Sequence, residues 1–99
     1  MSQNTFIKSV TNQFKGFTIC VTGLFDKFSS KGEFESYFEK RGGITVDFPD
    51  KTCKFLVCGK FTDSYIQPEK TARYIKAKEL SVKIISEYDF FDWTRNMQP

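Results

Sequence analysis

A threonine-glycine pair and several lysine and arginine residues have the types and spacing that anion binding requires. Thr22 offers a hydroxyl donor, and Gly23, which has no side chain, lets its backbone N–H approach a ligand closely. Lys31 lies where one helix is expected to begin, and Lys70 and Arg73 lie near the start of another. A cation at a helix N-terminus opposes the helix dipole at a cost of roughly 0.3–1 kcal/mol, which a bound anion would offset. These residues therefore predict a phosphate site.

Each of these residues also has an ordinary structural explanation. The Thr22-Gly23 pair could simply end a strand and form a turn, and Arg73 could pair with Glu69 or Asp63. The basic stretch at residues 70–83 holds five cations and one anion, which also suits a solvated helix face. The phosphate site is favoured by the convergence of several such residues on one edge of the fold, not by any single residue.

No other pattern in the chain supports catalysis or metal binding. The sequence has no histidine, which removes the commonest general base near neutral pH and all His-containing zinc sites. Cys20, Cys53 and Cys58 match no zinc spacing and no disulfide framework, so we expect reduced thiols. Neither Gly42-Gly43 nor Gly59-Lys60 follows the phosphate-loop pattern. We therefore expect a non-catalytic domain with no cofactor and no metal.

The composition is that of one globular domain. A chain of 99 residues with 39% hydrophobic and 27% charged residues can bury a single core. Its net charge of +3 is only a weak indication of a polyanionic partner. No apolar run approaches the roughly 18 residues that a membrane span needs. Because residues 1–17 also lack an apolar signal segment, we expect an intracellular protein with no membrane partner.

Hydrophobic periodicity predicts strands that alternate with helices. Strands are expected at residues 17–22, 44–46, 53–58 and 82–85, and helices at residues 4–14, 31–41 and 68–80 and after Ser86. Ser30 and Glu33 have the spacing of a capping box, Gly42-Gly43 would stop that helix, and Pro68 fits a first helical position. The alternation predicts an α/β fold, a three-layer α/β/α sandwich around a four-stranded parallel sheet. In such a sheet, the carboxyl ends of strands and the starts of helices share one edge.

Several segments of this pattern resemble a BRCT domain. They are the runs at residues 14–16, 19–23, 52–57 and 76–87, together with the Gly42-Gly43 helix stop. The resemblance covers residues 14–95 and implies a single domain there, with a helical extension at residues 1–13 and a tail at residues 96–99. It also implies the strand order 2-1-3-4, which places the switch point between the first and third strands, near the expected anion site.

The resemblance implies roles for individual residues. In phosphate-binding BRCT domains, a Ser or Thr at the end of the first strand, the next glycine amide and a Lys at the start of the second helix hold the phosphate. Thr22 and Gly23 match this pattern, whereas Arg73 falls at the lysine position, which leaves Lys70 as a competing candidate. Arginine can also hold phosphate, through two parallel hydrogen bonds. Lys31 falls where the BRCT domains of NAD-dependent DNA ligases and of the eukaryotic clamp-loader large subunit carry a basic residue.

The function implied is a binding module of DNA replication or repair that recognises a phosphate, in particular the 5′ phosphate of a DNA end. Lys70 and Lys76 would add contacts to the DNA backbone. The alternatives are a module that binds a phosphorylated protein or a plain interaction or dimerisation domain. Many peptide-binding BRCT domains have a Trp where this chain has Asp89, and Trp93 lies four residues later. The implied location is the nucleus in a eukaryote, or the cytoplasm or nucleoid in a bacterium or virus, alone or as part of a ligase or clamp loader.

Overall fold

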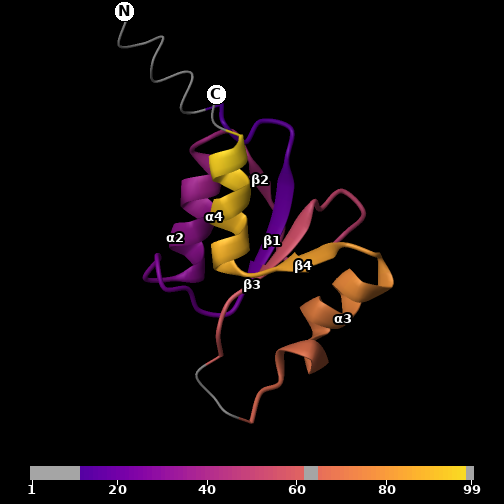
Figure 1. Cartoon of the computed structure of the whole chain (residues 1–99). Helices are drawn as coiled ribbons and strands as arrows, with labels where there is room; N and C mark the ends of the chain where they lie inside the picture. The colour runs from indigo at the N-terminus through magenta and orange to yellow at the C-terminus, as the bar shows by residue number, and fades with distance from the viewer. Residues whose placement is uncertain (1–11, 62–64, 98–99) are drawn as a thin grey trace, which may run out of the picture.

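Four parallel strands form the sheet of the computed structural model, which describes residues 12–61 and 65–97. The order across the sheet is β2-β1-β3-β4, with the bounds Thr18–Thr22 for β1, Ile44–Thr45 for β2, Phe55–Cys58 for β3 and Lys83–Ile85 for β4. The central strands pair from Ile19 with Phe55 to Thr22 with Cys58, so they end side by side (Figure 1). The predicted α/β fold and strand order are confirmed.

The central strands are buried on both faces, as their nearly continuous apolar sequences predict. Ile19 and Val21 of β1 belong to one core cluster, whereas Cys20 belongs to a second cluster on the opposite face. Because side chains alternate along a strand, Thr22 lies on the same face as Cys20. This alternation determines which helix the threonine faces.

Helices cover both faces of the sheet (Figure 1). Two of them lie on one face and the third on the other, with the bounds Lys31–Glu39 for α2, Glu87–Asn96 for α4 and, on the opposite face, Ala72–Glu79 for α3. Phe34 of α2 and Phe90 of α4 are fully buried in the first core cluster. Ala77 of α3 packs with Cys20 in the second cluster. The starts of all three helices therefore lie near the carboxyl edge of the strands.

Both ends of α2 follow from local sequence. The Ser30 hydroxyl accepts a hydrogen bond from the Glu33 backbone N–H at 3.1 Å, as the predicted capping box requires. The Glu33 carboxylate turns back to the backbone N–H of Ser29, at 3.1 Å, instead of that of Ser30. At the other end, Gly42 has a φ of +90°, and a Cβ on Gly43 would lie 2.1 Å from a ring carbon of Phe38. Both glycines are thus needed where the chain leaves the helix.

The basic helix predicted at residues 68–80 is not continuous, and the prediction is wrong in its first turn. Pro68–Lys70 forms a short 3₁₀ turn, and Thr71 between this turn and α3 has extended backbone angles. The Thr71 hydroxyl donates to the Pro68 carbonyl at 2.7 Å and so closes the 3₁₀ turn on itself. Because α3 begins only at Ala72, Arg73 lies in its first turn and Lys70 lies outside the helix.

The N-terminal helix predicted at residues 4–14 falls mostly outside the described residues, and residues 12–16 form a turn. Within this turn, Phe14 is fully buried, and its ring stacks on that of Phe38 with centroids 4.5 Å apart. No helix in the two described ranges is long and apolar enough to cross a membrane.

Candidate functional site

Thr22 is the last residue of β1 and is buried, with 6% of its surface exposed. Its backbone carbonyl accepts a hydrogen bond from the Gly59 N–H at 2.8 Å, which ties the end of β1 to the end of β3. No side-chain oxygen that is sealed from solvent lacks a hydrogen-bond partner in the described part of the chain. The strand end is therefore rigid, and it points the Thr22 side chain toward the α3 face of the sheet.

Gly23 turns the chain away from the sheet in a conformation that favours glycine. Its φ is +87°, and a Cβ at this position would lie 3.0 Å from the carbonyl carbon of Gly59 and from the carbonyl oxygen of Lys60. The next residue, Leu24, exchanges two backbone hydrogen bonds of 2.7 Å with Lys60. The loops that follow β1 and β3 are therefore in close backbone contact beside the site.

Lys31 and Arg73 come to the site from helices on opposite faces of the sheet. Lys31 is the first residue of α2 and is half-buried. Arg73 lies in the first turn of α3, and its Nε donates to the backbone carbonyl of Asp47 at 2.7 Å. Arg73 thus contacts the main chain after β2. Of the two acidic residues that could have paired with it, Glu69 does not do so, and Asp63 lies outside the described residues. The contact with Asp47 orients the guanidinium and leaves its remaining N–H groups for other acceptors.

The charges of Lys31 and Arg73 both act on the thiol of Cys20. Burial raises the pKa of Cys20 to about 11, and the neighbouring Cys53 adds to this increase. The positive charges of Arg73 and Lys31, together with a hydrogen bond from the Arg73 side chain, act on the Cys20 pKa in the opposite direction. Because Cys20 lies two residues before Thr22 on the same face of β1, both cations lie near the strand end that carries Thr22.

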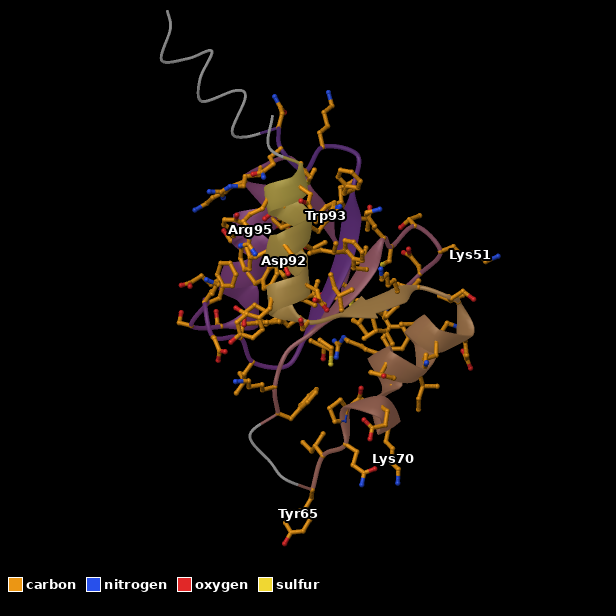
Figure 2. All side chains as sticks on the ribbon, viewed as in Figure 1. Lys51, Tyr65, Lys70, Asp92, Trp93 and Arg95 are labelled. Atoms are coloured by element: carbon orange, nitrogen blue, oxygen red, sulfur yellow. The ribbon has the colours of Figure 1, made fainter. Side chains whose placement is uncertain are left out.

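Lys70 and Lys76 do not join this cluster. Lys70 is exposed in the 3₁₀ turn before α3, and its side chain points away from the sheet (Figure 2). Lys76 lies one turn beyond Arg73, where its Nζ is 3.6 Å from the carboxylate of Glu79. Of the two candidates for the second-helix cation, Arg73 acts on Cys20, two residues before Thr22, whereas the Lys70 side chain points away from the sheet.

The structure also places Glu87, which sequence reasoning did not single out, at the same edge of the sheet. This first residue of α4 is buried, and its carboxylate accepts hydrogen bonds from the backbone N–H groups of Asp26, at 2.8 Å, and Lys27, at 2.7 Å. The Ser86–Asp89 cap spacing indicates that Glu87 begins a helix. Its partners could not be found in this way, because they lie about sixty residues earlier in the chain.

The three cysteines are free thiols, and burial raises the pKa of each one. Among residues 12–61 and 65–97, no group of three or more acidic or cysteine side chains is close enough to hold a metal ion. The chemistry that these ranges offer at the site is therefore hydrogen bonding and positive charge.

Comparison with known protein families places this chain in a defined group. The model of the BRCA1 C-terminus (BRCT) domain matches residues 9–92, which is most of the chain. The chain belongs to the BRCT family. The family resemblance deduced from the Thr-Gly and Gly-Gly motifs is therefore confirmed.

The curated relatives of this BRCT domain include bacterial DNA ligases. The chain is 33% identical over 81 residues to a DNA ligase of Thermotoga petrophila, a match that covers 82% of the chain and 10% of the ligase. A DNA ligase of Fervidobacterium nodosum is 30% identical over 84 residues, covering 85% of the chain and 11% of the ligase. A DNA ligase of Petrotoga mobilis is 33% identical over 78 residues, a match that covers 79% of the chain and 10% of the ligase. The chain thus spans about a tenth of the length of these relatives.

The structure places three residues that the family resemblance singles out. Arg73, expected at the position of the phosphate-binding lysine, lies in the first turn of α3. Asp89, expected at the position of the tryptophan of many peptide-binding members, is exposed on α4. Trp93 packs against the core rings of Phe17 and Phe55 at centroid distances of 5.0 and 5.1 Å.

Proposed function

We propose that this BRCT domain is a non-catalytic module that binds the 5′ phosphate of a DNA end. The observation that carries the proposal is that Thr22 ends β1 at the edge of the sheet where α2 begins with Lys31 and α3 begins its first turn with Arg73. The repulsion between two cations near one strand end is offset by an anion bound between them. A phosphate monoester has the charge and the acceptor oxygens to fill that place.

In the proposed complex, each residue contributes a different interaction. The uncharged Thr22 hydroxyl and Gly23 backbone N–H donate hydrogen bonds to phosphate oxygens, and the first turn of α2 directs its backbone N–H groups toward the same region. Arg73, oriented by its bond to the Asp47 carbonyl, gives a charge-assisted contact through its other N–H groups. Lys31 adds a single mobile positive charge. Lys70 and Lys76, outside the cluster, would contact the neighbouring DNA backbone without regard to the end.

A DNA end is the preferred source of the phosphate because relatives of this chain are DNA ligases. We propose accordingly that the domain acts as the DNA-contacting part of a larger replication or repair enzyme, to which it adds binding and no catalysis. A phosphorylated protein offers the same phosphate chemistry, so a phosphopeptide is the competing ligand in the experiment below.

The test measures the affinity of the domain for one labelled DNA duplex with and without a 5′ phosphate, and compares Thr22→Ala with wild type. Thr22 carries no charge, so its loss should reduce the preference for the phosphorylated end and leave binding to the unphosphorylated duplex intact. One hydrogen bond to a charged group contributes about 1.5–3 kcal/mol, so the preference should fall about ten- to a hundredfold.

Thr18→Ala is the matched control, because Thr18 lies at the opposite end of the same strand. It should keep the full preference for the phosphorylated end. An unchanged preference in Thr22→Ala, or a wild-type domain that binds both duplexes equally, would refute the DNA-end proposal. Saturable binding of a phosphothreonine peptide, abolished by Thr22→Ala, would then assign the pocket to a phosphorylated protein.

A further inference from the structure

Glu87 is a buried carboxylate that fastens the loop between β1 and α2. It has 4% of its surface exposed. Its two carboxylate oxygens accept hydrogen bonds from two backbone N–H groups, with N···O distances of 2.8 and 2.7 Å. A buried carboxylate is unfavourable unless its oxygens are hydrogen-bonded. Here Oε1 accepts from Asp26 and Oε2 from Lys27, so each oxygen has its own donor.

The fastened loop joins the two halves of the proposed phosphate site. Residues 24–30 run from the Thr22-Gly23 pair at the end of β1 to Lys31 at the start of α2. Any movement of this loop changes the separation between the neutral donors and the Lys31 charge. The starts of α2 and α4 also lie near each other at this edge (Figure 1).

A second set of contacts holds the same loop from outside. The Asp26 carboxylate accepts hydrogen bonds from the Tyr88 hydroxyl and from Lys60 Nζ, the latter at 3.4 Å. These bonds lower the pKa of Asp26, with the Tyr88 bond as the largest cause. Leu24 is joined to Lys60 through backbone hydrogen bonds. The loop is therefore attached both to α4 and to the chain after β3.

We propose that Glu87 is a positioning residue that fixes the β1–α2 loop and thereby sets the distance between Thr22-Gly23 and Lys31. This role rests on the function proposed above, because the position of the loop matters for binding only if a phosphate lies between Thr22-Gly23 and Lys31. A carboxylate is the side chain suited to the task, because two adjacent backbone N–H groups need two acceptor oxygens. Glutamine has only one acceptor oxygen. Its NH₂ group would face the second backbone N–H, and two donors cannot form a hydrogen bond with each other.

The experiment compares Glu87→Gln with Asp89→Asn. Both variants remove one negative charge from the first turn of α4, but Asp89 is exposed and lies outside the contacts to the loop. Glu87→Gln should lower the preference for a 5′-phosphorylated duplex about tenfold, while affinity for the unphosphorylated duplex stays at the wild-type value. Asp89→Asn should leave both values unchanged.

The backbone amides of Asp26 and Lys27 give a separate spectroscopic readout. In ¹H–¹⁵N spectra, hydrogen bonds to a carboxylate should shift both amide protons downfield and protect them from exchange. Glu87→Gln should move at least one of these signals upfield and speed its exchange, and Asp89→Asn should move neither. A role limited to general stability would change neither these two signals selectively nor the ratio of the two duplex affinities.

Tyr88→Phe covers the case in which Glu87→Gln fails to fold. Tyr88 is exposed and holds the loop through Asp26, so its loss should lower the 5′-phosphate preference in the same direction but by less. The positioning role is overturned if wild type prefers the phosphorylated end and folded Glu87→Gln does so equally. If Glu87→Gln is unfolded, an unchanged preference in Tyr88→Phe overturns it. A wild-type domain without any preference overturns the proposed function, and the positioning role with it.

Discussion

At the scale of single residues, the site depends on how one strand distributes its side chains. Cys20 and Thr22 share the face of β1 that is directed toward α3, and Ile19 and Val21 fill the opposite core. The Arg73 side chain acts on the Cys20 thiol and lowers its pKa against the effect of burial. The buried thiol thus contributes to the core and also borders the two cations.

The raised pKa of Cys20 predicts a loss of stability in alkaline solution. The folded protein holds the thiol proton more tightly than the unfolded chain, because the pKa rises from 9.0 to about 11 on folding. The stabilisation is fully present below pH 9 and is lost as the pH rises toward 11. It amounts to at most about 2–3 kcal/mol, and urea unfolding at pH 8 and pH 10.5 should detect it.

Cys20→Ala provides the control for this prediction. The variant should be less stable at pH 8 because it leaves a cavity, but its stability should fall less between the two pH values. An equal fall in both proteins would assign the alkaline transition to other groups.

At the scale of elements, the start of one helix and the stop of another place the cations. The short 3₁₀ turn at Pro68–Lys70 takes the place of the first turn of a continuous helix, so α3 begins at Ala72 and Arg73 lies in its first turn. The Gly42-Gly43 pair ends α2 where Phe38 lies against the backbone. Each boundary thus depends on contacts between residues that are close in the chain.

Two glycine substitutions near α2 should change the free energy of unfolding in opposite directions. Gly43→Ala would place a Cβ within 2.1 Å of the fully buried Phe38 ring and should destabilise the domain by about 1–3 kcal/mol. Gly32→Ala lies on the exposed side of α2, where the nearest atom to a new Cβ is Ser30 Oγ at 3.9 Å. It should stabilise the domain by about 0.5–1 kcal/mol, because alanine has the higher helix propensity.

Thermal or urea unfolding of both variants checks this pair. A stable Gly43→Ala would mean that Phe38 moves aside without cost, and the close approach would then not explain the glycine. A destabilised Gly32→Ala would contradict an exposed helical position.

At the scale of the whole molecule, the cations proposed to contact DNA come from α2, the 3₁₀ turn and α3. The net charge of +3 is small, so any attraction to DNA must come from this local arrangement. Lys31 and Arg73 are near the strand end, whereas Lys70 and Lys76 lie farther out.

Duplex binding should therefore weaken steeply with salt. Each phosphate neutralised contributes about −0.9 to the slope of log affinity against log salt, so four engaged cations predict a slope of roughly −3 to −4. Lys70→Ala should make the slope less negative by about 1 and leave the 5′-phosphate preference intact. Arg73→Ala should make the slope less negative and also lower the 5′-phosphate preference. A slope near zero in wild type would mean that these cations are only a solvated surface.

The sequence by itself determined the fold class, the strand order through the family resemblance, and the two glycine-marked turns. Apolar runs, capping residues and glycines act over a few neighbouring residues, so their consequences can be predicted locally. The Thr22-Gly23 pair at the end of β1 and the start of α2 at Lys31 follow from such signals. The start of the basic helix could not be predicted in this way. At Thr71 a local side-chain hydrogen bond to the Pro68 carbonyl closes a 3₁₀ turn, where a continuous α-helix was expected.

Only the tertiary structure decided which backbone group Arg73 contacts and what holds the loop between β1 and α2. The bond from Arg73 to the carbonyl of Asp47, 26 residues earlier, depends on the orientation of α3 against the sheet. Glu87 reaches Asp26 and Lys27 across about sixty residues, a pairing that appears only when α2 and α4 pack on the same face. Such contacts depend on the relative placement of whole elements, which no local pattern encodes.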